Sequence, residues 1–325
     1  MRTENTTRFP LVLLLGFQVD PIFKIPIMIP MCILYILTVT GNLLITALVQ
    51  LSQNLKYPMF FFLSHLSLCD IVLTTSIVPN MLHVIQCGGI TITIALCTTQ
   101  FQFFATAVAS ECLLLAVMSY DRYLAICNPL RYTSIMDNQC CLWLVTSCWF
   151  SSFTASLGAV IMINRLEFCH QNIINNFFCD FWPILKLSCS DTFAVEMEQM
   201  LIGFPLVVFP VVFICVTYIY ISTSIFRISS SSGRQKAFST CSSHLTVVCI
   251  FFGTMIANYF VPSTRNSIKL DKLISLFYTV ITPLLNPIIY SLRNLEIRVA
   301  FEKLVIAMKL KSTNLNYFKK LNLKP

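Results

Sequence analysis

Seven long apolar stretches constrain this chain more than any other feature of its sequence. Five of them contain no Asp, Glu, Lys or Arg, and they cover residues 25–55, 138–164, 199–226, 237–264 and 273–292. Two more, at about 57–82 and 97–123, are interrupted within the apolar run by one acid apiece, Asp70 and Glu111. A helix of about 20 apolar residues crosses the hydrocarbon core of a bilayer. The pattern therefore predicts an all-α membrane protein, a bundle of seven transmembrane helices.

Charged residues are scarce throughout the chain. Only 11% of its 325 residues are Asp, Glu, Lys or Arg, and 56% are hydrophobic, whereas a soluble domain carries about 25% charged residues. A soluble protein of this size exposes too much surface to bury so much apolar material. The sequence also contains no His-Glu-x-x-His, no nucleophile elbow and no phosphate-binding loop. Composition and motifs thus argue against an enzyme, and no cofactor is expected except a bound sodium ion.

The distribution of basic residues predicts the orientation in the membrane. One side of the bilayer receives 14 basic and 4 acidic residues, and the other receives 8 of each. The basic side is cytoplasmic by this rule, so 1–24 is an extracellular tail, 25–291 the transmembrane domain and 292–325 a cytoplasmic segment. This segment then contacts membrane lipid and not nucleic acid. It begins with an expected amphipathic helix, whose apolar face carries Ile297, Phe301, Leu304 and Met308.

The expected extracellular segments contain sites for covalent modification. Asn5-Thr6-Thr7 is an acceptor sequence for N-glycosylation. Five cysteines lie on this side, Cys87, Cys97, Cys169, Cys179 and Cys189. A bridge from the beginning of the third helix to the long loop at about 164–197 would fold that loop over the bundle as a lid. Four cysteines allow three pairings and a fifth is left over, so spacing alone does not choose among them.

Three motifs lie at the expected cytoplasmic ends of helices. They are Met118-Ser119-Tyr120-Asp121-Arg122-Tyr123-Leu124-Ala125-Ile126-Cys127, Lys236-Ala237-Phe238-Ser239-Thr240-Cys241-Ser242-Ser243-His244 and Pro283-Leu284-Leu285-Asn286-Pro287-Ile288-Ile289-Tyr290. With Gly41-Asn42, the Pro58–Ser64 run, Ser190-Asp191 and the Ser243–Val248 run, they resemble the olfactory receptors, the odorant-sensing branch of the rhodopsin-like G-protein-coupled receptors. The resemblance covers nearly the whole chain and is closest to the tetrapod type. Phe60 and Phe252 depart from it, since the family usually has Tyr at both positions.

The resemblance implies a function and several residue roles. It implies a plasma-membrane receptor that binds a small volatile odorant and activates a heterotrimeric G protein of the stimulatory olfactory type, which raises cyclic AMP. It also implies disulfides Cys97–Cys179 and Cys169–Cys189, with Cys87 free. Two alternatives keep the membrane topology: a chemoreceptor of this fold acting outside the olfactory epithelium, and an ion-conducting or transport protein.

The motif residues are candidates for a switch that couples the receptor to its G protein. Asp121 would hold Arg122 at rest, and the released guanidinium would then line the G-protein pocket. The alternative is a pair that only anchors helix 3 at the membrane surface. Pro287 interrupts the helix 7 hydrogen-bond ladder, which predicts either a hinge or a fixed kink. The candidate switch residues are Asp121, Arg122, Tyr123, Tyr218, Asn286, Pro287 and Tyr290.

Asp70 and Glu111 are candidates for an ion site inside the membrane. A carboxylate within the bilayer costs roughly 2.5–3.5 kcal/mol on insertion scales, so both should face the bundle interior. Asn42, Asn286 and Ser67 are expected near them. Two buried like charges do not ionise together without a cation. The pair would therefore hold sodium or share a proton, or it consists of two protonated acids in hydrogen bonds.

The ligand site is expected in the outer half of the bundle, under the lid. Helical spacing predicts a mostly apolar wall, in which only Tyr259 and Thr279 offer side-chain hydrogen bonds. The predicted wall contains no Lys or Arg, which argues against a carboxylate ligand. Such a wall suits a small hydrophobic volatile. The predicted wall consists of Phe104, Ala105, Val108, Ala109, Ile202, Gly203, Leu206, Phe252, Met255, Ile256, Tyr259, Leu276 and Thr279.

Overall fold

The computed structural model describes residues 11–169, 172–227, 230–260 and 268–306. Within these ranges, seven helical segments are long and apolar enough to cross a membrane, which confirms the predicted fold class. The spans are Pro21–Leu51, Pro58–Cys87, Ile94–Cys127, Asn138–Ile163, Phe193–Phe226, Cys241–Asn258 and Leu270–Ser291.

The first four spans are the single helices α1 (Pro21–Leu51), α2 (Pro58–Cys87), α3 (Ile94–Cys127) and α5 (Asn138–Ile163). The fifth combines α7 (Phe193–Glu198), a π-helical turn η2 (Gln199–Gly203) and α8 (Phe204–Phe226). The sixth lies in α9 (Ser231–Phe260), and the seventh combines α10 (Ile268–Leu276), a π-helical turn η3 (Phe277–Ile281) and α11 (Thr282–Arg293). Short connections are η1 (Gln53–Leu55), α4 (Pro129–Ile135) and α6 (Phe181–Leu185).

Local chemistry sets several helix boundaries. The Thr93 side chain accepts a hydrogen bond from the Leu96 amide and caps α3, and Asp137 caps α5 through the Cys140 amide. Pro58 begins α2, where its missing N–H costs nothing. Gly88, at φ 77°, ends this helix in the left-handed conformation that glycine adopts most easily. The last residue of α2, Cys87, lies five residues beyond the expected end near Leu82, and the helix continues through Pro79 to reach it.

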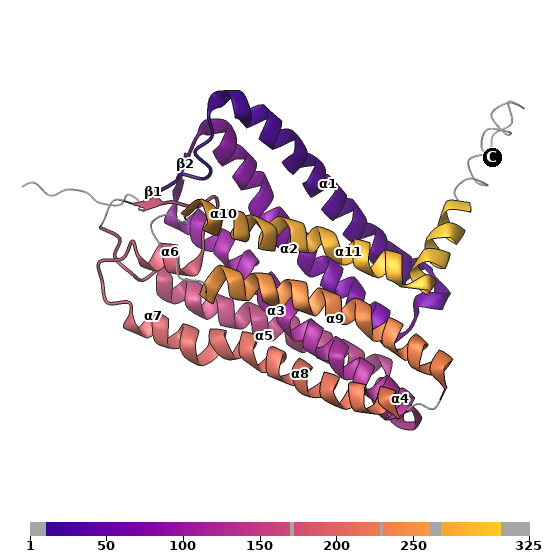
Figure 1. Cartoon of the computed structure of the whole chain (residues 1–325). Helices are drawn as coiled ribbons and strands as arrows, with labels where there is room; N and C mark the ends of the chain where they lie inside the picture. The colour runs from indigo at the N-terminus through magenta and orange to yellow at the C-terminus, as the bar shows by residue number, and fades with distance from the viewer. Residues whose placement is uncertain (1–10, 170–171, 228–229, 261–267, 307–325) are drawn as a thin grey trace, which may run out of the picture.

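A small sheet covers one end of the bundle. Strand β1 (Leu11–Leu14) pairs antiparallel with β2 (Ile90–Thr93) and parallel with β3 (Ile173–Ile174). The segment before helix 1, expected to be a tail, is thus partly structured, because Val12 and Leu14 alternate with more exposed residues and are fully buried. We refer to this end, with the strands and α6, as the sheet end, and to the opposite end of α3 as the Arg122 end (Figure 1).

Helix α3 forms the centre of the bundle and packs on α2, α5 and α8. The surfaces of α1 and α8 that face away from α3 are apolar and exposed, with Ile22 at 82% and Phe226 at 76%. Exposed apolar surface of this kind is stable in lipid. Residues 295–306 are helical after α11; Ile297 of the expected amphipathic face is buried and Phe301 is exposed, while Met308 lies outside the described residues.

Candidate functional site

A cavity of about 450 Å³ lies toward the sheet end, between α3, α5, the fifth span and α9. Apolar and aromatic side chains form most of its wall. This size and composition are typical of small-molecule sites. The residues that line it are Phe101, Phe104, Ala105, Val108, Ala109, Ser152, Ala155, Ser156, Ala159, Asp180, Phe181, Trp182, Glu198, Gln199, Met200, Gly203, Phe204, Leu206, Val207, Val208, Val211, Phe252, Met255 and Ile256.

Nine residues of the predicted wall line this cavity: Phe104, Ala105, Val108, Ala109, Gly203, Leu206, Phe252, Met255 and Ile256. Ile202, Leu276 and Thr279 do not. Ile202 lies within the π-helical turn η2 and is 46% exposed, while the Thr279 hydroxyl donates to the Ser275 carbonyl within the seventh span. The side chain of Tyr259 lies outside the described part of the chain.

Three aromatic rings pack together where α3 and α9 meet the seventh span. Tyr278 is fully buried, and its ring centroid lies 6.3 Å from that of Phe104 and 6.1 Å from that of Phe251. These side chains fill the space in which Leu276 and Thr279 were expected to meet a ligand. The cavity is therefore lined by α5 and not by the seventh span.

The contribution of α5 was not predicted. Ser152, Ala155, Ser156 and Ala159 line the cavity from this helix. Their spacing of three, one and three residues puts four small side chains on one helical face, and this signal was present in the sequence. The acid Glu198, between the predicted loop at about 164–197 and the apolar run 199–226, was also missed.

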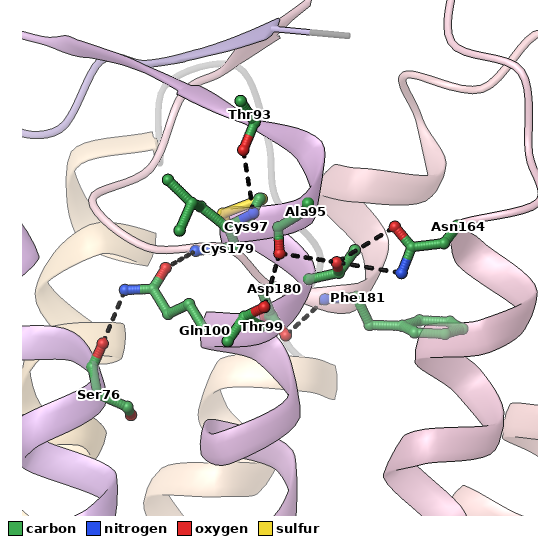
Figure 2. The surroundings of a disulfide bond; sticks show 12 residues. Ser76, Thr93, Ala95, Cys97, Thr99, Gln100, Asn164, Cys179, Asp180 and Phe181 are labelled. Atoms are coloured by element: carbon green, nitrogen blue, oxygen red, sulfur yellow. Dashed lines mark hydrogen bonds between the residues drawn. A yellow bond between two sulfur atoms is a disulfide. The ribbon is translucent and has the colours of Figure 1, made fainter. Parts of the chain in front are cut away.

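The roof of the cavity is tied to α3 by a disulfide. Both disulfides implied by the family resemblance are present, Cys97–Cys179 and Cys169–Cys189, and Cys87 is free and exposed. Gln100 strengthens the first, because its Oε1 accepts from the Cys179 amide at 2.9 Å while its Nε2 donates to the Ser76 carbonyl at 2.9 Å (Figure 2). The lid is thus fixed to α3 and, through Gln100, to α2.

A polar cluster joins α3 to α5 along one side of the cavity. Gln102 Nε2 donates to Ser156 Oγ at 2.8 Å and to Thr106 Oγ1 at 3.1 Å, and the two hydroxyls are 2.8 Å apart. The Ser152 hydroxyl, one turn before Ser156 in α5, is buried and has no hydrogen-bond partner among the described residues. On the α5 side of the cavity, this hydroxyl therefore remains available to a ligand.

Two acids and one amide meet in the middle of the bundle. Asn286 Nδ2 lies 3.0 Å from each Asp70 carboxylate oxygen and 3.3 Å from Glu111 Oε1. All three side chains are buried, and Glu111 Oε2 has no hydrogen-bond partner among the described residues. One amide nitrogen has only two hydrogens to offer, so it cannot satisfy two carboxylates. Asp70, Glu111 and Asn286 are therefore the residues that could hold a cation or share a proton.

Pro287 disturbs helix α11 one turn from these acids. Because proline has no N–H, the Pro283 carbonyl four residues earlier loses its helical donor. Asn42 of α1 replaces that donor through its Nδ2, at 3.1 Å. Gly41 lets α1 approach, since a Cβ there would lie 3.3 Å from a ring carbon of Pro287. The Gly41-Asn42 pair thus compensates the proline.

At the Arg122 end, Asp121 holds two partners. Arg122 donates to Asp121 Oδ2 from Nε at 2.9 Å and from Nη2 at 2.5 Å, and the Tyr132 hydroxyl donates to Asp121 Oδ1 at 2.8 Å. Asp121 is fully buried and the Arg122 side chain is 13% exposed. Tyr132 is half-buried, and this burial together with the negative charge of Asp121 raises the pKa of Tyr132. The predictions included Asp121 and Arg122 but missed Tyr132, in α4.

Tyr218 does not contact Arg122 through a hydrogen bond here. Its hydroxyl is 2.8 Å from His244 Nδ1, and His244 Nε2 is 3.1 Å from the Leu115 carbonyl. Since a carbonyl only accepts, Nε2 carries the proton and Nδ1 accepts from Tyr218. This chain of contacts joins α8, α9 and α3. His244, which belongs to the helix 6 motif, was not among the predicted switch residues.

The remaining predicted switch residues lie nearby or in the core. The Tyr123 hydroxyl accepts from Asn128 Nδ2 at 3.3 Å, and its ring contacts those of Tyr120 and Tyr220. Tyr290 is fully buried, and its hydroxyl has no hydrogen-bond partner among the described residues. Asn5, the predicted glycosylation acceptor, lies outside the described residues.

The fold and these sites define a class: a seven-helix membrane protein with a ligand-sized cavity toward one end and a buried charge pair at the other. The family model for olfactory receptors matches residues 31–308. Human olfactory receptor 1J4 is 44% identical over 304 residues, 94% of this chain and 97% of that protein. Human olfactory receptor 10A7 is 42% identical over 305 residues, 94% and 96%, and mouse olfactory receptor 5P52 is 40% identical over 306 residues, 94% and 99%.

The chain belongs to the olfactory receptor family. It is therefore a multi-pass protein of the plasma membrane with the role of an odorant receptor, and it is not an enzyme.

Proposed function

We propose that this receptor binds small, mostly hydrophobic volatile molecules in the cavity and activates a heterotrimeric G protein of the stimulatory olfactory type, raising cyclic AMP. The observation that carries the proposal is the cavity itself, about 450 Å³ with a largely apolar and aromatic wall. Helix α3 contributes to that wall and carries the Asp121–Arg122 pair at its other end. A ligand that shifts α3, or the helices packed on it, would therefore also displace Asp121 and Arg122.

The proposed orientation places the sheet end outside the cell. The excess of Lys and Arg beyond the Arg122 end favours a cytoplasmic location for that end. The two disulfides at the sheet end support the same assignment, because disulfides persist in the oxidising extracellular space. The helix at 295–306 then lies along the inner membrane surface, in contact with lipid.

Activation would act through the hydrogen bonds that join the helices near the Arg122 end. The Tyr218–His244–Leu115 chain joins α8, α9 and α3, and all three helices also line the cavity. A ligand that binds the active arrangement more tightly shifts the population toward it. Breaking this chain would let α9 move away from α3 and leave Tyr218 free to receive Arg122. Asn286 and Pro287 would supply the hinge in the seventh span.

The acids in the middle of the bundle are the proposed control point. Asp70, Glu111 and Asn286 would hold a sodium ion, or Asp70 and Glu111 would share one proton. The unsatisfied Glu111 Oε2 supports either form. In the part of the chain that the structure describes, no group of three His, Cys, Asp or Glu side chains is placed to hold a metal, so a monovalent ion suits the pair better than a transition metal.

The test is a cyclic AMP assay in cells that express the receptor with the olfactory G protein, screened against a broad odorant panel. Ala159 lines the cavity and is buried, so Ala159→Phe fills the space and should weaken the response at least tenfold. Arg122→Ala should abolish signalling without changing binding. Surface staining of each variant serves as the control. A response that survives both substitutions at equal surface level contradicts the proposal.

A further inference from the structure

Glu198 is an acid whose side chain forms no hydrogen bond or ion pair with the described residues. It lies at the end of α7, directly before the π-helical turn, and it lines the cavity. Its Oε2 is buried and has no hydrogen-bond partner among the described residues. Its Oε1 would lie 3.5 Å from a Cβ placed on Gly158, so the carboxylate rests against the backbone of α5 where that helix has no side chain.

Neighbouring acids are used by the fold in a way that Glu198 is not. Glu196 Oε1 accepts from the Thr192 hydroxyl at 2.7 Å, and Asp180 Oδ1 accepts from the Phe181 amide at 2.8 Å at the beginning of α6. No ion pair joins Glu198 to a basic side chain within the described residues. A carboxylate at an apolar wall without a partner is costly, and the structure gives it no stabilising role. The remaining role is toward a ligand.

The π-helical turn after Glu198 shapes this corner of the cavity. The Gln199 side chain folds back over Gly203, where a Cβ would come within 2.6 Å of the Gln199 amide carbon. Glycine at 203 therefore leaves room for Gln199 beside the wall. π-Helical turns are rare and often occur at functional sites. Here the turn holds Glu198 and Gln199 together at the same edge of an otherwise apolar wall.

The cavity around Glu198 suits a positive charge on a hydrophobic body. Among the described residues, no Lys, Arg or His lines it, and six aromatic side chains do: Phe101, Phe104, Phe181, Trp182, Phe204 and Phe252. A hydrogen bond between an ammonium group and a carboxylate is about twice as strong as a neutral one. Aromatic faces also attract cations and accept apolar groups.

We propose that the receptor recognises hydrophobic amines, with the ammonium group paired to Glu198 and the hydrocarbon or aryl body among the aromatic side chains. This inference rests on the proposed function, because it assumes that the cavity is the ligand site. It narrows the ligand class from hydrophobic volatiles to protonated amines. Carboxylic acids are excluded by repulsion from Glu198.

The experiment uses the purified full-length receptor and follows thermal unfolding as ligand is added. The matched probes are 3-phenylpropylamine and 3-phenylpropanol, which differ only in the terminal group. At pH 7 the amine should stabilise the receptor at a concentration at least tenfold below that of the alcohol. Glu198→Gln keeps the shape of the side chain and removes its charge, so the two probes should become equivalent within about twofold.

Glu196→Gln is the matched control, two residues away and outside the cavity wall. It should keep the full preference for the amine. Stabilisation by the alcohol in both variants shows that the cavity remains folded. An alcohol that acts as well as the amine in the unaltered receptor, or a preference that survives Glu198→Gln, overturns the inference. If neither probe stabilises the receptor and other odorants also fail, the proposed ligand site itself is wrong.

Discussion

The two ends of the bundle are held together by different kinds of interaction. At the sheet end, two disulfides and a three-stranded sheet fix the chain, and Gln100 links the lid to two helices. At the Arg122 end, side-chain hydrogen bonds join Asp121 to Arg122 and Tyr132, and Tyr218 to His244. Covalent bonds and strand pairing do not exchange partners on the timescale of signalling, whereas side-chain hydrogen bonds do. The receptor thus combines a rigid ligand end with an end that can rearrange.

Removing the disulfides of the rigid end should change the stability of the receptor most. The Cys97–Cys179 bridge closes a loop with a sequence separation of 82, and Cys169–Cys189 one of 20. In the chain-entropy view, removing them costs about 4.5 and about 3 kcal/mol respectively. Cys97→Ser with Cys179→Ser should therefore lower the unfolding temperature more than Cys169→Ser with Cys189→Ser. Thermal unfolding of the purified receptors measures this. An equal or reversed order contradicts the assignment of Cys97–Cys179 as the main tie.

Free Cys87 provides the control for both pairs. It is exposed and unpaired, so Cys87→Ser should leave the unfolding temperature unchanged.

The next effect concerns the end that can rearrange. Asp121→Asn removes the charge that holds Arg122, and hydrogen bonds to charged groups contribute about 1.5–3 kcal/mol. Part of this loss should appear as a shift toward the active arrangement, so basal cyclic AMP should rise while the response to ligand is kept. Asp137→Asn is the control, because Asp137 only caps α5. Unchanged basal activity at equal surface level would identify Asp121–Arg122 as a membrane anchor instead of a switch.

The sequence predicted the helical framework better than the cavity. Long uncharged runs identify spans because the bilayer tolerates few charges, and this signal does not depend on how the helices pack. The shape of the cavity depends on how the helices pack. Tyr278 fills the space on the side of the seventh span, and the π-helical turn η2 changes which residues of the fifth span face inward. Regular helical spacing predicted Ile202, Leu276 and Thr279 in the wall. Such spacing reveals neither the Tyr278 side chain nor the π-helical turn.

The buried acids also differ in how easily the sequence reveals them. Asp70 and Glu111 were recognised because an acid within an apolar run is conspicuous, and the structure brings both to Asn286. Glu198 was missed because it sits near other acids at the boundary of a loop, where a charge is ordinary. Only its position against Gly158 and its lack of a partner distinguish it.

A smaller effect is expected at Tyr132. Tyr132→Phe removes one hydrogen bond to Asp121, so it should cost about 1–2 kcal/mol and raise basal activity less than Asp121→Asn. The pKa of Tyr132 is raised in the folded receptor. The contribution of Tyr132 to the free energy of unfolding is therefore fully present below the ordinary tyrosine pKa of about 10. Above that pH the unfolded chain loses the proton first and the stability from Tyr132 declines. The gap in unfolding temperature between the receptor and Tyr132→Phe should therefore narrow above pH 10, and a widening gap contradicts this.

Gly41→Ala should have the weakest effect on stability. It tests whether the middle of the bundle is rigid, like the sheet end, or rearranges, like the Arg122 end. A Cβ on Gly41 would lie 3.3–3.4 Å from the Pro287 ring, so Gly41→Ala needs a shift of a few tenths of an ångström. The better helix propensity of alanine, about 0.5–1 kcal/mol, offsets the crowding, and the unfolding temperature should change little. If Pro287 is a hinge, the same substitution should alter basal cyclic AMP, because the crowding acts on one arrangement of α11 more than on the other. Gly253, which has no atom within 4 Å of an added Cβ, is the control. A Gly41→Ala receptor with unchanged stability and unchanged signalling assigns Pro287 to the rigid half, as a fixed kink that Asn42 satisfies.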